Sequence, residues 1–167
     1  MSTLCSFCPS PKGNLNCGIC DKTICRKCAQ FLEKHSFPLW EPKPAELLHE
    51  VYCAPCFIEK VAPAEALYEK TEGQARSVLV FYNSRGDESR PVKSSEKPLK
   101  VEGCIDRKEA MMRLAYLAAQ KDFNALIDVN LAQKKIHNGG HQTSRWYGSG
   151  TPARVNREKF PDENRPR

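Results

Sequence analysis

Four Cys-x-x-Cys pairs fall within the first 56 residues of this chain and constrain its fold more than any other feature. The pairs are Cys5/Cys8, Cys17/Cys20, Cys25/Cys28 and Cys53/Cys56, and the ninth cysteine, Cys104, stands apart. A Cys-x-x-Cys pair on a tight turn directs two thiolates at one cation, so two pairs complete a tetrahedral site of four sulfur ligands. Four pairs therefore predict two such sites.

Zinc is the metal that this pattern favours. Soft thiolates suit zinc, and although four cysteines also bind iron–sulfur clusters, paired spacing of this kind is typical of structural zinc knuckles. We therefore expect two Zn²⁺ ions. Because four sulfur ligands leave no coordination position for water, both sites should be structural. A thioredoxin-like redox role for a single pair would need a strand and helix context that this segment lacks.

The spacing of the pairs restricts which of them share an ion. Only four residues join Cys20 to Cys25, which is too few for the second and third pairs to face one ion from opposite sides. These two pairs should bind different ions. Two arrangements remain: a sequential one (first with second, third with fourth) and an interleaved one (first with third, second with fourth).

Residues 4–60 resemble FYVE-type zinc fingers and their relatives, mainly through CGICDKTICRKC at 17–28 and EVYCAPCF at 50–57. In that family the pairs interleave. The resemblance thus implies a cross-brace double-zinc finger over residues 1–62. It implies one zinc ion on Cys5, Cys8, Cys25 and Cys28, and a second on Cys17, Cys20, Cys53 and Cys56. RING and PHD fingers usually take one histidine ligand, so with eight cysteines we expect His35 and His49 at the surface or beside the ligands.

The residues before the third cysteine do not predict phosphoinositide binding. FYVE domains that bind these lipids carry a basic, histidine-containing run at this point, whereas residues 12–16 contain one lysine and no histidine. The family's N-terminal tryptophan motif is also missing. Related fingers without this motif dock proteins, so we expect a protein partner and no phosphoinositide or membrane surface. The insertion between the third and fourth pairs should form a small core over the zinc sites, with a partner-docking edge as the alternative, through Phe31, Phe37, Leu39 and Trp40.

The second half of the chain predicts a small α+β domain at 77–155. A helical linker at 63–76 joins it to the finger, and the helix of this linker should end at Gly73. Strands are expected at 78–82, 99–105 and 127–131, and one helix at 106–122, in the order strand, strand, helix, strand. A further strand is expected near 151–155. The segment 101–131 resembles small bacterial α+β proteins, some named heavy-metal-binding, which implies the strand–helix–strand arrangement.

Alternation and capping residues place the faces of these elements. Leu99, Val101, Gly103 and Ile105 should lie on the buried face of their strand, opposite Cys104, and Ile127, Val129 and Leu131 should share one face of the next. Asp106 followed by Glu109 is typical of a capping box at the start of the helix. Asn124 should end it.

The remaining segments predict loops. Residues 83–98 are polar, 137–150 are rich in glycine, and the charged tail at 156–167 should be disordered. His137 and His141 should stay unliganded for want of a third ligand. A basic and aromatic set could bind nucleic acid, although a solvated tail is the simpler interpretation. Its members are Arg145, Trp146, Tyr147, Arg154, Arg157, Arg165 and Arg167.

Composition narrows the class of protein. The chain has 167 residues, of which 40% are hydrophobic and 28% charged, and no apolar run approaches the length of a bilayer span. Without a signal peptide it should be cytoplasmic. Since no catalytic triad or paired carboxylates stand out, we expect a non-catalytic interaction or scaffold protein. A RING-like ubiquitin-ligase adaptor is the alternative.

Overall fold

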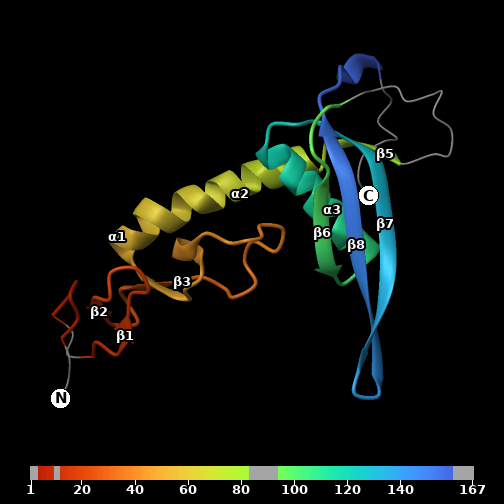
Figure 1. Cartoon of the computed structure of the whole chain (residues 1–167). Helices are drawn as coiled ribbons and strands as arrows, with labels where there is room; N and C mark the ends of the chain where they lie inside the picture. The colour runs from red at the N-terminus through yellow and green to blue at the C-terminus, as the bar shows by residue number, and fades with distance from the viewer. Residues whose placement is uncertain (1–3, 10–11, 83–93, 160–167) are drawn as a thin grey trace. The chain divides into compact units, whose positions relative to one another are not determined.

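The computed structural model describes residues 4–9, 12–82 and 94–159. The chain is mixed α/β and divides into two compact units, Met1–Glu69 and Lys70–Arg167 (Figure 1). Among the described residues, no helix is both long and apolar enough to cross a bilayer. Most of the predicted loop at 83–98 and of the predicted tail at 156–167 lies outside the described residues.

Two short antiparallel strand pairs build the first unit. Strand β1 (Leu15–Asn16) pairs antiparallel with β2 (Thr23–Ile24), and β3 (Ala29–Phe31) pairs antiparallel with β4 (Val51–Cys53). A 3-10 turn, η1 (Ala45–Leu47), precedes β4.

A small core joins these strand pairs. Ile24, Tyr52 and Val61 are fully buried. The Tyr52 hydroxyl lies 2.8 Å from two backbone carbonyl oxygens, those of Glu46 and His49, and so satisfies its buried polar end.

A continuous helix follows β4. It consists of α1 (Ala54–Cys56), the π-helical turn η2 (Phe57–Val61) and α2 (Ala62–Ala75). Pro63 lies inside it, where its ring would ordinarily clash with the carbonyl four residues earlier. The wide turn just before Pro63, in which the Ala62 N–H donates to the Phe57 carbonyl, accommodates the ring without ending the helix.

The expected helix end at Gly73 is wrong, because α2 continues to Ala75. A glycine inside a helix costs only about 1 kcal/mol relative to alanine. The buried side chains of Thr71 and Ala75 flank Gly73 and hold the last turn in place.

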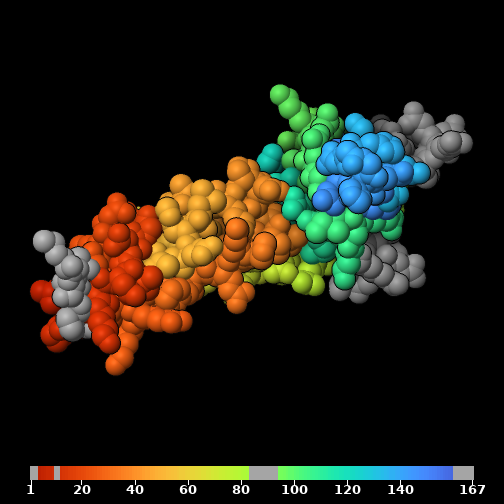
Figure 2. All heavy atoms as spheres, turned by 90° about the horizontal axis from the view of Figure 1, so that it is seen from below, coloured from red at the N-terminus to blue at the C-terminus, as the bar shows by residue number. Residues whose placement is uncertain are grey.

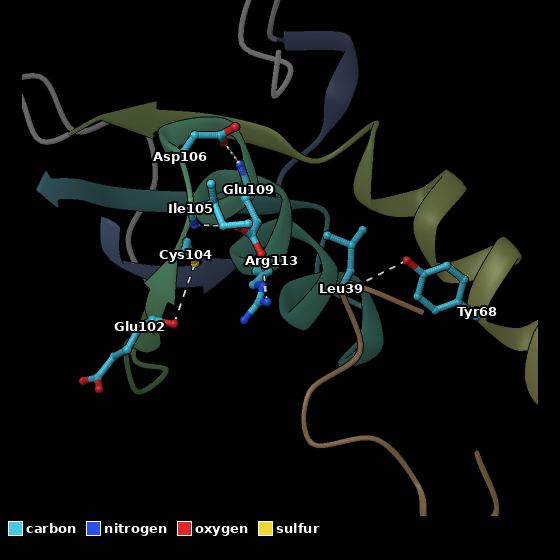
Figure 3. A network of polar contacts seen from close by, with 8 residues as sticks. All are labelled: Leu39, Tyr68, Glu102, Cys104, Ile105, Asp106, Glu109 and Arg113. Carbon is cyan, nitrogen blue, oxygen red and sulfur yellow. Dashed lines mark hydrogen bonds and ion pairs between the residues drawn. The ribbon is translucent and has the colours of Figure 1, made fainter. Parts of the chain in front are cut away.

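The insertion between the third and fourth cysteine pairs packs on α2. The Phe37 ring lies 5.1 Å from the Tyr68 ring, and the Trp40 ring stacks on Tyr68 at 6.4 Å. The backbone N–H of Leu39 donates to the Tyr68 hydroxyl at 3.4 Å (Figure 3). Phe31, by contrast, is 55% exposed. The predicted small core exists, and its aromatic rings gather around Tyr68 of α2.

The second unit is a four-stranded sheet with the order β5-β7-β8-β6. The strands are β5 (Leu79–Tyr82), β6 (Leu99–Cys104), β7 (Ala125–Asn138) and β8 (His141–Ala153). β5 runs parallel to β7, and the other pairs are antiparallel. Helix α3 (Arg107–Gln120) packs against the sheet (Figure 1). The elements follow one another in the order β5, β6, α3, β7, β8, and β8 includes the first part of the further strand expected near 151–155.

The predicted glycine-rich loop at 137–150 is wrong, because most of it is strand. β7 and β8 form one long hairpin that turns at Gly139 and Gly140, whose φ angles are +53° and +94°. Positive φ at both central residues is the geometry of a tight two-residue hairpin turn, for which Asn-Gly and Gly-Gly sequences are suited.

Two local irregularities invert the predicted strand faces. Gly103, with φ of +69°, breaks the register of β6 between Val101 and Cys104, so that Cys104 is fully buried and Ile105 is 72% exposed. Asp128, with φ of +53°, lies in a bulge of β7 that separates Ile127 from Val129. An extra residue in a strand shifts the alternation by one, so both single-face predictions are wrong.

The predicted capping box is confirmed at the start of α3. The Asp106 carboxylate accepts the Glu109 N–H at 2.7 Å, and the Glu109 carboxylate accepts the Ile105 N–H at 2.6 Å (Figure 3). Glu109 also pairs with Arg113 at 2.8 Å. These contacts satisfy backbone donors that the first helical turn leaves without partners.

The end of α3 is set by Asp122 and not by Asn124. Asp122 has φ of +59°, and the Phe123 N–H reaches back to the Ala118 carbonyl at 3.0 Å, as in a Schellman motif. Asn124 instead bonds both backbone polar groups of Val155, each at 2.9 Å. Its amide thereby joins the start of β7 to the chain that follows β8.

Replacing Gly148 by valine should destabilise the second unit. A Cβ at Gly148 would lie 2.9 Å from side-chain carbons of Leu114 and Leu131, so α3 and β7 leave no room for it. Overpacking of this kind costs about 1–3 kcal/mol, which thermal unfolding followed by circular dichroism would record as a lower Tm.

Gly73→Ala is the control with the opposite sign. No atom lies within 4 Å of a Cβ at Gly73, so alanine should stabilise the exposed end of α2 by about 0.5–1 kcal/mol. An unchanged Tm in Gly148→Val would show that α3 does not pack on β8 as described.

Candidate metal centre

The eight paired cysteines converge in two groups. Within each group, all four sulfur atoms lie within 4.8 Å of one another. The groups are Cys5, Cys8, Cys25, Cys28 and Cys17, Cys20, Cys53, Cys56. None of these cysteines forms a disulfide. The structure therefore has the interleaved arrangement, with the first pair meeting the third and the second meeting the fourth.

Strand β2 explains why the second and third pairs separate. Cys20 precedes this strand and Cys25 follows it. At the first group, the Ser6 N–H donates to the Thr23 carbonyl at 2.9 Å, and the Cys25 N–H donates to the Cys5 sulfur at 3.3 Å. The first pair is thus fastened to the end of β2.

The second group is assembled by backbone contacts to β4. The Gly18 N–H donates to the Val51 carbonyl at 2.9 Å, which brings the Cys17/Cys20 turn to the strand that ends at Cys53. Within that turn, the Asp21 N–H bonds the Cys17 carbonyl at 2.9 Å, and Asp21 has φ of +56°. A residue in the left-handed region closes the turn tightly enough to aim both sulfurs the same way.

The sulfur spacing fits a tetrahedral metal ion. The Cys8 and Cys25 sulfurs are 3.5 Å apart, and the Cys20 and Cys53 sulfurs are 3.7 Å apart. Four ligands at a zinc–sulfur distance of about 2.3 Å define a tetrahedron with edges of roughly 3.8 Å. Each group could therefore hold one metal ion, and the pair of groups is compatible with a double zinc finger.

Backbone donors and crowding act in opposite directions on the thiols of the first group. The backbone N–H of Phe7 lowers the pKa of Cys5 to about 6, against the effect of burial and helped by the N–H of Cys25. The neighbouring sulfurs of Cys8 and Cys25 raise the pKa of Cys28 to about 12.

The second group shows the same opposition. Burial raises the pKa of Cys17, but the N–H groups of Cys20 and Cys53 outweigh it and lower the value to about 6. Burial raises the pKa values of Cys53 and Cys56. Without a cation, each group would hold both thiolate and thiol, and a bound dication removes the repulsion that prevents full ionisation.

The two histidines of the first unit lie outside both sulfur groups. His35 and His49 are exposed. The His49 side chain lies directly against Gly18, where an added Cβ would overlap its Cβ and Cγ atoms. The His49 ring also meets the Tyr52 ring edge-on at 6.2 Å. His49 therefore lies beside the second cysteine turn and is not one of the sulfur group's members.

A hollow of about 670 Å³ lies beside the first group. Its wall includes Cys8 and Cys25 together with three cationic side chains, those of Lys12, Arg26 and Lys27. Lys12 is the one lysine of residues 12–16, whereas Arg26 and Lys27 lie inside the third cysteine pair, and that Arg-Lys dipeptide was the sequence signal for these two cations.

The remaining sequence candidates do not form a second centre. Cys104 is buried in the second unit, where its thiol contacts the Glu102 carbonyl at 3.8 Å (Figure 3). The hairpin register pairs His137 with Gln142 and His141 with Asn138, so the two imidazoles lie on opposite faces. Among the described residues, only the two cysteine groups bring three or more metal-ligating side chains together.

The described arginines of the predicted nucleic-acid set lie on separate segments and have different neighbours. Arg154 stacks over the Phe123 ring at 5.5 Å, and Arg157 donates to the Ser77 carbonyl at 3.0 Å. Arg145 lies in β8 beside Trp146, opposite Lys134 of β7. Arg165 and Arg167 lie outside the described residues.

No protein-family model matches the chain, and no curated protein or solved structure matches it either. The geometry of the sulfur groups therefore carries the functional argument.

Replacing Gly18 by alanine should weaken metal binding in the second group only. The new methyl group would displace His49 and the contact between Gly18 and Val51 that brings the cysteine turn to β4. Loss of such a supporting contact costs about tenfold or more in metal affinity. With protein loaded with Zn²⁺, metal release to a chromophoric chelator should show one ion leaving early and one at the wild-type rate.

The double variant Gly18→Ala/His49→Gly tests the cause. Removing the His49 side chain clears the space for the methyl group, so slow release of both ions should return. If Gly18→Ala alone releases both ions at the wild-type rate, the close packing of Gly18 has no bearing on the site.

Proposed function

We propose that the first unit is a structural two-zinc module and that the protein is a non-catalytic interaction protein, which uses this module to dock a protein partner. The observation that carries the proposal is the closure of both sulfur groups. Each supplies four soft ligands at tetrahedral spacing, which fills the coordination sphere of zinc. A closed site of this kind holds a fold together and leaves no position for an activated water.

The modest core of the first unit supports a structural role for the metal. Its largest fully buried side chains outside the cysteines are Tyr52, Ile24 and Val61. So short a segment seldom folds stably without a metal or disulfides, because it buries too little apolar surface to offset the entropy of ordering the chain. Two zinc ions would supply that stabilisation, since binding to a site that forms only on folding is coupled to folding.

Exposed apolar side chains on this unit support protein docking. Phe31 is 55% exposed, Leu48 66% and Ile58 70%. Large apolar side chains at a surface are typical of protein contacts when several occur on one small unit. A FYVE-related finger without the lipid-binding motif is consistent with the same role.

Purified protein should contain two equivalents of zinc. In the interleaved arrangement, Cys25→Ser opens the first group and Cys53→Ser opens the second, so each variant should retain about one equivalent. Elemental analysis by mass spectrometry measures the ratio. Cys104→Ser is the matched control, because Cys104 lies outside both groups, and it should retain two equivalents. Iron in place of zinc, or full retention in both ligand variants, would contradict the proposal.

A ubiquitin-discharge assay separates the scaffold from a RING-like ligase adaptor. With a panel of ubiquitin-charged conjugating enzymes, the zinc-loaded protein should leave the rate of ubiquitin transfer to free lysine at its background value. Acceleration that disappears in Cys53→Ser would refute the scaffold function and establish the adaptor.

A further inference from the structure

The outer half of the β7–β8 hairpin extends beyond its neighbouring strands. Towards the tip of the hairpin, pairing with the neighbouring strands stops at two residues. Val129 is the outermost residue of β7 that pairs with β5, and Trp146 is the outermost residue of β8 that pairs with β6. Residues 132–147 therefore form a two-stranded ribbon. Beyond Gln133 and Trp146, no other strand in the described part of the chain pairs with it. Figure 1 shows this ribbon projecting from the sheet, and Figure 2 looks onto its end, which lies in front of the rest of the unit.

The ribbon has no core of its own. From Ala132 to Thr143 nearly every residue is exposed, on both faces of the hairpin, and Ile136 is the one large aliphatic side chain in that stretch. An isolated two-stranded hairpin is marginally stable in water. A ribbon of this length without apolar cover is more suited to a polar partner than to a lipid or an apolar groove.

The ribbon itself contains basic residues and no acidic one. Between Asp128 and Glu158 the chain has five basic residues and no acidic one, namely Lys134, Lys135, Arg145, Arg154 and Arg157. Three of these, together with two histidines, belong to the ribbon. This unit as a whole has 19 basic and 12 acidic residues, a net charge of +7.

The register adds a specific feature, because it sets Lys134 directly opposite Arg145. Directly opposed side chains on neighbouring strands are only about 5 Å apart at their Cβ atoms, so two cations there repel each other. An anion placed between them would convert this repulsion into attraction. Gln133, Gln142 and Thr143 add hydrogen-bonding groups along the same ribbon.

We propose that the ribbon at 132–147 binds duplex DNA by entering the major groove, with Lys134, Lys135 and Arg145 on the phosphates. The B-form major groove is about 12 Å wide and 8.5 Å deep and admits a two-stranded ribbon. Seven residues per strand give a length of about 24 Å, which exceeds that depth. The major groove of duplex RNA is too narrow for side chains to enter, so DNA is the partner that the dimensions favour.

Charge repulsion opposes the alternative partner, a second copy of the chain that pairs with the ribbon edge. A second copy of the chain pairing along the ribbon would bring the same cations into contact with each other. The DNA proposal rests on residues 132–147 and is independent of the zinc module, so the two proposals fail separately.

Fluorescence anisotropy of a labelled 30-base-pair DNA duplex tests the proposal with the full-length zinc-loaded protein. The wild type should bind at 50 mM salt and weaken steeply as salt rises. The triple variant Lys134→Gln/Lys135→Gln/Arg145→Gln should bind at least about tenfold more weakly, and the slope of log affinity against log salt should decrease by about 3.

A second triple variant controls for net charge. Lys97→Gln/Lys108→Gln/Lys121→Gln removes three exposed charges of the same unit outside the ribbon and should bind nearly as well as the wild type. The ribbon variant should also keep its Tm or raise it, because it removes the repulsion between Lys134 and Arg145. A loss of folding would therefore contradict the argument from register.

Four results would overturn the proposal. They are no binding of the wild type to duplex DNA at 50 mM salt, equal losses in the two triple variants, duplex RNA or single-stranded DNA bound as tightly as duplex DNA, and binding to phosphatidylserine vesicles without binding to DNA. The zinc content should be two equivalents in every variant, which keeps this test separate from that of the metal sites.

Discussion

Repulsion among crowded sulfur atoms is the constraint on which the first unit depends. Four thiols within 4.8 Å of one another cannot all ionise in the absence of a cation, and the opposite pKa shifts within each group express this conflict. The backbone favours the first ionisation in each group through N–H donors, whereas the later ones need a positive charge. The strand pairs β1–β2 and β3–β4 are too short to hold the groups together by their own pairing, so the fold and a bound cation would depend on each other.

The sequence predicts what is decided by neighbouring residues. The Cys-x-x-Cys pairs and the Asp106/Glu109 capping box depend on spacings of three residues, and both could be derived before the structure. The choice between interleaved and sequential pairing of the cysteines could not be derived from local spacing. It depends on backbone contacts between distant segments, such as Gly18 with Val51, which no local pattern encodes.

The predicted faces of β6 and β7 were wrong for a different reason. A period of two survives only while every residue stays extended, and one residue in the left-handed region reverses everything beyond it. In β6 the signal was visible, since Gly103 is a residue that favours such a bulge. In β7 it was not, because Asp128 is not a glycine. The prediction of a loop at 137–150 was wrong because the flanking strands gave no signal. Asn138-Gly139-Gly140 is typical of a hairpin turn, but the polar residues around it lack the alternation that marks a strand.

The division of charge between the units favours different partners for each. The first unit has seven basic and eight acidic residues, a net charge of −1. Each site of four thiolates and one Zn²⁺ would add a charge of −2, which brings the loaded unit to −5. The second unit has a net charge of +7, so the basic character of the chain belongs to it alone. A negatively charged module with exposed apolar side chains is suited to a protein surface, whereas long-range attraction would draw a polyanion to the second unit. Metal loading would thus increase the difference in charge between the two units by making the first unit more negative while leaving the second unchanged.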